Sequence, residues 1–355
     1  MSGASDQPVT SGRATIREVA ALAGVGTMTV SRVVNNSGYI SLETRTKVEA
    51  AIEELHYLPN QNARRLRVQK SATIALIVTD ITNPFFTTLA RGVEDVARDH
   101  GYLVLLGNTD EDQGEESRYL KLLVQQGVDG VILVPATTSA GSTSNSNSFE
   151  LARQHRLALV AVDRRVEDGI DCVRCDSEKG AFSLGEHLIK QGHRKFALLS
   201  GPADASTTKD RIAGFLRATK GFKIQSEVLY GEFSVADGAR LAVRAMNSSF
   251  RPTAIFALNN FLTIGALNGL REAGFRIPED ISIVGFDDLP ANLITFPFLT
   301  VCAQPSYELG RLAAERLFAR IEDPGLKAES IILDTELVIR GSTANIRSQK
   351  VRVEI

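Results

Sequence analysis

The residues with the clearest chemical pattern lie between positions 27 and 32. Small hydroxyl side chains stand beside a methionine and an arginine there: Thr27, Met28, Thr29, Ser31 and Arg32. Hydroxyl groups reach phosphate oxygens, and an arginine can donate two parallel hydrogen bonds to the edge of a guanine. The segment is therefore suited to contact both the backbone and the bases of DNA. The solvated polar face of an ordinary three-helix bundle would fit this spacing equally well.

A second pattern is a single apolar residue among cations. Leu66 is flanked by Arg64, Arg65 and Arg67 in a segment that is too short to form a stable helix alone. An apolar side chain between cations can wedge into a minor groove while the cations contact phosphates. The alternative is a solvated linker with one stray leucine.

Other chemistries find little support. Cys172 and Cys175 have the spacing of metal and redox motifs, but they lie in a strand-like segment, where residues i and i+3 point to opposite faces. There is no second such pair, no histidine pair with metal-ligand spacing, no nucleophile elbow and no phosphate-binding loop. We therefore predict that the protein is not an enzyme, has no catalytic residues and binds no metal.

The first of these patterns falls within a predicted group of three short helices. Thr15 and Glu18 have the spacing of a capping box, and apolar residues then recur at helical spacing up to residue 23. Glycines 24 and 26 break this helix, a second is predicted over residues 27–34, and a third over residues 41–55. Two short helices joined by a tight glycine-containing turn predict a helix-turn-helix unit.

From residue 72 onward, short apolar runs alternate with helical patterns. The runs are residues 74–78, 103–106, 131–134, 159–162, 196–199, 254–258 and 281–284. The helical patterns are residues 88–100, 115–126, 178–191, 209–220 and 261–273. Strands buried on both faces and followed by helices predict parallel sheets, and two such halves place a ligand crevice between them. Residues 136–148 are low in complexity and are predicted to form a loop.

Composition fits a two-part protein in the reducing cytoplasm. The chain has 355 residues, 43% of them hydrophobic, with three cysteines, no apolar run long enough to span a membrane and no signal-peptide pattern. Its net charge of −2 divides unevenly, because residues 1–70 carry nine basic and six acidic side chains. A basic head on an acidic body indicates an anionic partner for the head.

Residues 14–35, ATIREVAALAGVGTMTVSRVVN, closely resemble the N-terminal region of the lactose-repressor/galactose-repressor (LacI/GalR) family. The resemblance continues through residues 44–49 and 57–60, and through later landmarks at residues 83–86, 281–288 and 304–305. It spans residues 14–345. On these motifs the chain is identified as a member of that family.

The resemblance implies a fold and a domain plan. An all-α helix-turn-helix head (14–59) and a hinge helix (60–70) would follow a tail (1–13) and precede an α/β body resembling periplasmic binding proteins (71–345), with a second tail at 346–355. The body would divide into two doubly wound parallel-sheet subdomains. We expect the first subdomain to contain residues 71–162 and 292–322, and the second to contain residues 163–291 and 323–345.

The implied function is ligand-controlled binding of a pseudo-palindromic operator by a dimeric transcriptional regulator, most commonly a repressor. The matching base-reading positions are Thr27, Met28 and Arg32, and the matching phosphate-contacting positions are Thr15, Thr29, Ser31 and Asn35. The matching minor-groove hinge positions are Asn62, Ala63 and Leu66. Gly26 stands where many members have serine, which removes one hydroxyl that would anchor the DNA backbone.

The positions that match the family's effector-binding residues are Phe85, Phe86, Asp163, Arg211, Phe233 and Asn260. Aromatic faces stack on sugar rings, and Asp and Arg fix hydroxyl or carboxylate groups. Simpler interpretations are a hydrophobic core for the two adjacent phenylalanines and a structural ion pair for Asp163 and Arg211. Asn260 stands where sugar- and purine-binding members usually have aspartate. The effector is therefore expected to be a sugar or, alternatively, a sugar phosphate, a sugar acid or another anion, with no separate cofactor.

We expect a homodimer that contacts operator DNA and no membrane. Its interface is predicted at the helices of residues 88–100 and 115–126. The C-terminal tail lacks heptads, so the extra helix of tetrameric members is missing. The rival class is a sugar-binding receptor without regulatory function, against which the attached head and the missing signal peptide both argue.

Overall fold

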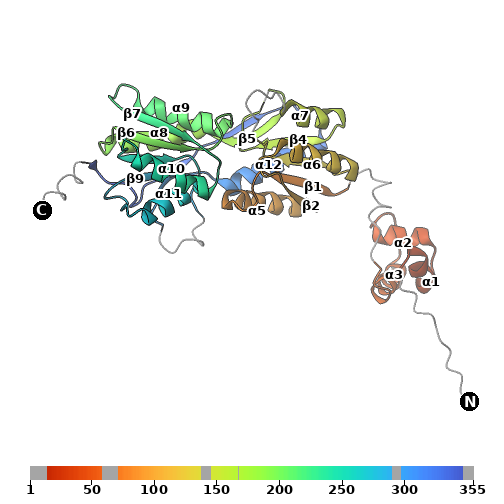
Figure 1. Ribbon diagram of the computed structural model, residues 1–355. Helices are drawn as coiled ribbons and strands as arrows, with labels where there is room; N and C mark the ends of the chain where they lie inside the picture. The colour runs from red at the N-terminus through yellow and green to blue at the C-terminus, as the bar shows by residue number, and fades with distance from the viewer. Residues whose placement is uncertain (1–13, 58–70, 137–144, 167, 290–296, 347–355) are drawn as a thin grey trace, which may run out of the picture. The chain divides into compact units, whose positions relative to one another are not determined.

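The computed structural model describes residues 14–57, 71–136, 145–166, 168–289 and 297–346 (Figure 1). The chain divides into two compact units, Met1–Ser71 and Ala72–Ile355. The predicted hinge residues Asn62, Ala63 and Leu66 lie outside the described residues, as do the N-terminal tail and residues 347–355.

The head consists of α1 (Ile16–Ala23), α2 (Thr27–Val34) and α3 (Leu42–Glu54), as predicted. Thr15 and Glu18 form the complete capping box of α1. Gly24 ends this helix in the left-handed region at φ 67°, which a residue without Cβ adopts at little cost. Val19, Val30 and Val48, one from each helix, are fully buried and hold the three helices together.

The first lobe of the body is a six-stranded sheet in the order β11-β5-β4-β3-β1-β2. Its strands are β1 (Thr73–Val78), β2 (Leu103–Asn108), β3 (Gly130–Leu133), β4 (Ala158–Val162), β5 (Asp171–Cys175) and β11 (Ser330–Leu333). Helices α5 (Pro84–Asp99) and α12 (Ser306–Glu322) share one hydrophobic core with this sheet. Helices α6 (Gln113–Gln126) and α7 (Asn145–Gln154) contribute to the core on its other face.

The second lobe repeats this plan in the order β12-β10-β9-β8-β6-β7. Its strands are β6 (Lys195–Ser200), β7 (Gln225–Tyr230), β8 (Ala254–Ala257), β9 (Ser282–Phe286), β10 (Thr300–Ala303) and β12 (Glu336–Val338). Helices α10 (Val235–Asn247) and α11 (Asn260–Glu272) pack on one face, and α8 (Ser177–Lys190) and α9 (Ser206–Thr219) pack on the other. All ladders in both sheets are parallel except the one between β10 and β12.

The predicted boundaries between the two subdomains are wrong at three strands. β5 and β11 belong to the first sheet, although residues 163–291 and 323–345 were assigned to the second subdomain. β10 belongs to the second sheet, although residues 292–322 were assigned to the first. The chain crosses between lobes after each of these strands, and an apolar pattern does not reveal which sheet a strand joins.

Two further expectations need correction. The run at residues 103–106 forms β2, but this strand lies at the edge of its sheet, and Leu103 is 66% exposed in the single chain. The segment predicted as a loop over residues 136–148 already contains the start of α7 at Asn145. In the part of the chain that the structure describes, no helix has the length and apolar character needed to cross a membrane.

Candidate functional site

The outer surface of α2 presents the predicted base-reading residues to solvent. Thr27, Met28 and Arg32 are all exposed, Met28 to 63%. Within residues 14–57, Arg32 has no ion-pair partner, so its guanidinium is free to bind a base or a phosphate. Gly26 gives α2 no side-chain cap, which leaves the N–H groups of Thr27 and Met28 to an anion, whereas the Thr29 N–H donates to the Gly26 carbonyl at 2.9 Å.

The predicted phosphate-contacting residues divide into two kinds. Thr29 and Ser31 are half-buried on α2, and the Ser31 hydroxyl accepts a hydrogen bond from Asn35 Nδ2 at 3.3 Å, which leaves its proton free to donate. Asn35 Nδ2 also donates to the Ser31 carbonyl at 2.7 Å. Thr15 Oγ1 donates to Glu18 Oε2 at 2.9 Å. The side-chain donors of Thr15 and Asn35 are therefore engaged within the head itself.

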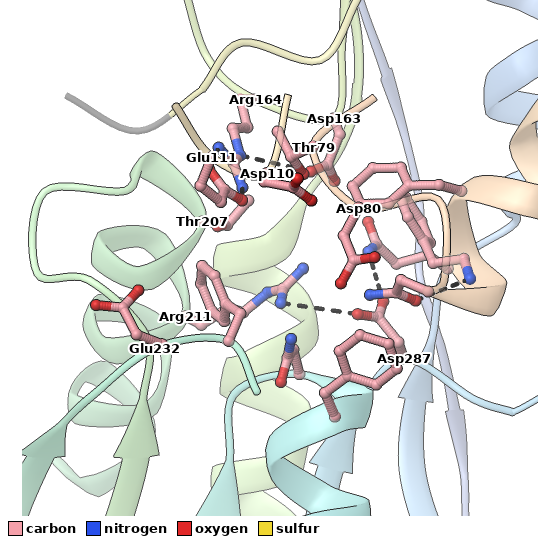
Figure 2. Close-up of a pocket in the computed structure, with 17 residues that line it drawn as sticks. Thr79, Asp80, Asp110, Glu111, Asp163, Arg164, Thr207, Arg211, Glu232 and Asp287 are labelled. Atoms are coloured by element: carbon pink, nitrogen blue, oxygen red, sulfur yellow. Dashed lines mark hydrogen bonds and ion pairs between the residues drawn. The ribbon is translucent and has the colours of Figure 1, made fainter. Parts of the chain in front are cut away.

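The body contains a cavity of about 300 Å³ where the carboxyl ends of strands from both sheets meet (Figure 2). Five of the six predicted effector residues line it: Phe85, Phe86, Asp163, Arg211 and Phe233. Parallel sheets bring these segments together because the loops that leave their strands share one edge. The cavity thus joins side chains from both lobes in one site.

Aromatic rings form the apolar walls of the cavity. Phe85 and Phe86 meet edge to face with 5.1 Å between ring centroids, and Phe233 and Phe261 contribute from the other lobe. The two adjacent phenylalanines also belong to the core of the first lobe, so the core interpretation and the site interpretation both hold. Rings from both lobes can stack on a flat apolar face of a ligand.

Asp163 lies immediately after β4 beside a charged pair. Burial raises the pKa of Asp163 to about 6, while the neighbouring Arg164 and Arg211 oppose this shift. Arg164 donates to both carboxylate oxygens of Glu111, at 2.7 and 2.5 Å (Figure 2). It also donates to the Pro135 carbonyl at 2.7 Å. The Arg164 guanidinium is therefore largely committed to the protein.

In the second lobe, Arg211 and Asp287 form a buried ion pair. Arg211 lies 3.8 Å from the Asp287 carboxylate (Figure 2). Its guanidinium lies 3.8 Å from the Phe286 ring centroid, and its Nη1 donates to the Leu258 carbonyl at 2.5 Å. Gln304 Nε2 donates to Asp287 at 2.6 Å. Burial raises the pKa of Asp287, opposed by Arg211 and Gln304. The simpler interpretation, a structural ion pair between Asp163 and Arg211, is wrong, because the ion pair of Arg211 is with Asp287.

The cavity is acidic and incompletely hydrogen-bonded. Two guanidinium groups face six carboxylates, which belong to Asp80, Asp110, Glu111, Asp163, Glu232 and Asp287. Arg164 Nε, Arg211 Nε and Gln304 Oε1 are buried and have no hydrogen-bond partner among the described residues. A ligand with several hydroxyl groups can donate to the carboxylates and accept from the free N–H groups.

Asn260 does not line the cavity, contrary to the prediction. Its side chain is 1% exposed and pairs with Asn83, while its neighbours Asn259 and Phe261 do line the cavity. Asn260 is the first residue of α11, and its side-chain oxygen accepts from the backbone N–H of Phe261 at 2.8 Å. The amide is held at the start of the helix and turned toward the other lobe.

Several residues that line the cavity were not predicted from the sequence. Among them are Arg164, Asn259, Asp287 and Gln304. A signal was present, because each follows within two residues of a strand end, as Asp163 does. Treating every polar residue at the carboxyl end of a buried strand as a candidate would have found them.

The cysteine pair lies in β5, and Cys175 belongs to the hydrophobic core of the first lobe. Cys172 and Cys175 are free and buried, as is Cys302. Burial raises the pKa of Cys172 to about 11 and raises that of Cys175, which disfavours the reactive thiolate. Across the described ranges, no group of histidine, cysteine and acidic residues is arranged to hold a metal ion.

Comparison with known protein families gives two matches. Residues 15–60 match the model for "Bacterial regulatory proteins, lacI family", and residues 71–340 match the model for "Periplasmic binding proteins and sugar binding domain of LacI family". The second match alone covers more than half of the chain.

Individual relatives are similar over nearly the whole chain. The ribose operon repressor of Halalkalibacterium halodurans is 38% identical over 331 residues, which cover 93% of this chain and 97% of that protein. A ribose-bound LacI family regulator from Enterococcus faecium is 34% identical, with a TM-score of 0.68 over 77% of this chain and 99% of that chain. The lac repressor dimer bound to operator is 27% identical, with a TM-score of 0.82 over 94% of this chain and 100% of that chain.

Proposed function

The chain belongs to the LacI family of bacterial regulatory proteins, and from this premise we propose that it is a repressor whose operator affinity is set by a neutral sugar, with ribose as the first candidate. The observation that carries the choice of sugar is the charge of the cavity. Six carboxylates outnumber two guanidinium groups that are already bound to protein atoms. A phosphate or carboxylate ligand would meet net repulsion there, which argues against the anionic alternatives.

The relatives support the same choice. One curated relative is named a ribose operon repressor, and one similar regulator was crystallised with bound ribose. We propose that Phe85, Phe86 and Phe233 stack on the sugar ring, and that Asp163 and Arg211 bind its hydroxyl groups. Asp287 and Arg164 join them, since both line the same cavity.

For the head, we propose that α2 lies in the major groove of operator DNA. Exposed Thr27, Met28 and Arg32 would contact bases, while Thr29 and Ser31 would bind phosphates. The hinge residues Asn62, Ala63 and Leu66 stay a proposal from the resemblance, with Leu66 as the minor-groove wedge. The family members are regulators, and we propose no catalytic activity for this chain.

We propose that the first lobe forms the dimer interface. Leucines 103, 105 and 106 of the edge strand β2 are exposed in the single chain, and Leu122 of α6 is exposed as well. A partner subunit would bury this apolar edge together with Leu122, which lies in one of the two helices expected at the interface, residues 115–126. Leu105→Glu should shift the protein from dimer to monomer in sedimentation velocity, and an unchanged dimer would place the interface elsewhere.

The test of function has two arms. Calorimetric titration of the full-length protein with ribose and with ribose 5-phosphate should show binding of the neutral sugar only. Selection of bound duplexes from a random DNA pool, with and without ribose, should enrich a two-fold-symmetric site. Preferred binding of the phosphate would overturn the neutral-sugar proposal. Failure to enrich any duplex would overturn the regulator proposal.

A further inference from the structure

Asn83 and Asn260 form a reciprocal pair of hydrogen bonds between the two lobes. Asn260 Nδ2 donates to Asn83 Oδ1 at 2.8 Å, and Asn83 Nδ2 donates to Asn260 Oδ1 at 3.2 Å. The two residues are 177 positions apart. Asn83 caps α5 in the first lobe, and Asn260 begins α11 in the second. Both side chains are buried, with 7% and 1% exposed.

The orientation of both amides is fixed by the helices that carry them. Asn83 Oδ1 also accepts from the backbone N–H of Phe85 at 3.0 Å, and Asn260 Oδ1 accepts from the N–H of Phe261 at 2.8 Å. Each oxygen is thereby anchored at a helix N-terminus, and each NH₂ group is directed at the opposite lobe. Rotating either amide would place its NH₂ group against a backbone N–H. Only a residue that is both donor and acceptor fits each position.

The pair adjoins the cavity on both sides. Phe85 and Phe86 follow Asn83 closely, and Asn259 and Phe261 flank Asn260. All four line the cavity, as does Asn83 itself, whereas Asn260 does not. Separation of the lobes would break the pair and move both of these walls apart.

We propose that Asn83 and Asn260 form a buried amide clasp that stabilises the closed arrangement of the two lobes, and that Asn260 is a positioning residue for the effector. The clasp acts through the equilibrium between open and closed body. A ligand that binds the closed form gains affinity whenever the protein alone favours that form. This inference rests on the proposed function only for the choice of ribose as a probe.

Asn260→Asp is the most informative substitution, because two interpretations predict opposite signs. As part of a clasp, the substituted side chain would lose its donor and set a carboxylate oxygen against Asn83 Oδ1, so ribose should bind about tenfold more weakly. As a sugar-contacting residue, an aspartate would accept two hydroxyl groups, and ribose should bind more tightly. Asn268→Asp makes the same chemical change on an exposed position of the same helix and should leave affinity unchanged.

A second readout needs no ligand. Spin labels are attached to the full-length protein at Thr87→Cys in α5 and Lys209→Cys in α9, one in each lobe. Pulsed electron paramagnetic resonance then measures the distance between the lobes. The native cysteines are buried, so the introduced thiols react first. Without sugar, Asn260→Asp and Asn260→Ala should shift the population toward longer distances, and Asn268→Asp should not. The buried charge of Asn260→Asp could prevent folding. Asn260→Ala removes the same hydrogen bonds without adding a charge, so it tests the clasp independently.

The outcomes separate the clasp from the sugar assignment. An unchanged distance distribution in both Asn260 variants overturns the clasp, as does tighter ribose binding by Asn260→Asp. A longer distance with unchanged ribose affinity overturns the positioning role. If the wild-type protein does not bind ribose, the sugar assignment is wrong, and the distance measurement still decides whether the clasp exists.

Discussion

Asp163 is a cavity carboxylate whose ionisation responds to a modest change of pH. Burial raises its pKa to about 6, with Arg164 and Arg211 opposing the shift and Asp287 and Glu111 adding to it. Sugar hydroxyls donate to the ionised form, so protonation competes with the ligand. We expect ribose affinity to be constant above pH 7, about twofold weaker at pH 6 and about tenfold weaker at pH 5. Calorimetric titrations across this range measure the effect.

Protonation of Asp163 has opposite effects on the two properties: it weakens ribose binding but stabilises the fold. A carboxyl whose pKa is higher in the folded than in the unfolded state destabilises the fold when ionised, and this cost disappears as pH falls from about 7 toward 4. Weaker binding at pH 5 therefore does not come from the loss of this residue's contribution to folding. Asp163→Asn serves as the control and should bind ribose weakly with no inflection near pH 6. A wild-type profile that stays flat to pH 5 would show that Asp163 does not accept from the sugar.

Arg32 is the residue on which DNA sequence preference should depend most. It is exposed on α2 and has no ion-pair partner within the described head. If it binds a guanine edge, Arg32→Ala should cost about 1–3 kcal/mol and relax the preference at one base position of each half-site. Binding to a panel of operators with single substitutions measures this. A uniform loss across the panel would make Arg32 a phosphate contact instead.

At the scale of elements, buried helices and strands could be predicted from the sequence. The polar edge strands, and the strands at which the chain crosses between the lobes, could not. The three head helices follow from apolar periodicity, and seven strands follow from continuous apolar runs; six of these lie inside their sheets and β2 lies at an edge. β7 and β12 were not predicted, because they are short or polar and lie at sheet edges, where a strand needs no continuous apolar run. The crossings between lobes at β5, β10 and β11 were not predicted, because both sheets offer a strand the same apolar environment. Asn260 was misplaced because a pattern of residue types does not specify which way an amide points.

Helices α5 and α12 cross in close contact, and a glycine substitution tests how much this contact contributes to stability. A Cβ added at Gly310 would lie 2.0 Å from the Leu89 carbonyl oxygen, and one added at Gly92 would lie 2.1 Å from that of Tyr307. Gly310→Ala should lower the free energy of unfolding by about 1–3 kcal/mol, because the helices must separate and this outweighs alanine's better helix propensity. Urea denaturation followed by circular dichroism measures it.

Gly325→Ala provides the comparison for this crossing. A Cβ there meets only Asp323 Oδ1 within 4 Å, at 3.2 Å, so the free energy of unfolding should change by less than about 0.5 kcal/mol. Equal effects of the two substitutions would mean that α5 and α12 can move apart without cost.

At the scale of the whole molecule, the head and the body are proposed to bind different ligands, and regulation requires that the two binding events are coupled. Residues 1–70 carry a net charge of +3, and the rest of the chain carries −5. DNA binding should therefore weaken steeply with salt, because cations of the head displace counterions from phosphates. Binding of the proposed sugar to the acidic body should depend little on salt, because that ligand is neutral. The two activities can thus be adjusted separately in one protein.

This separation allows a strict thermodynamic test. A repressor of sugar use is useful when the sugar releases it, so we expect saturating ribose to weaken operator binding by about 5- to 150-fold. Linkage then requires saturating operator DNA to weaken ribose binding by the same factor. Fluorescence anisotropy gives the first ratio and calorimetry gives the second, at one salt concentration. Ribose binding with unchanged operator affinity would show that ribose occupies the cavity without regulating the head, and the physiological effector would have to be another hydroxylated ligand that prefers one state of the body.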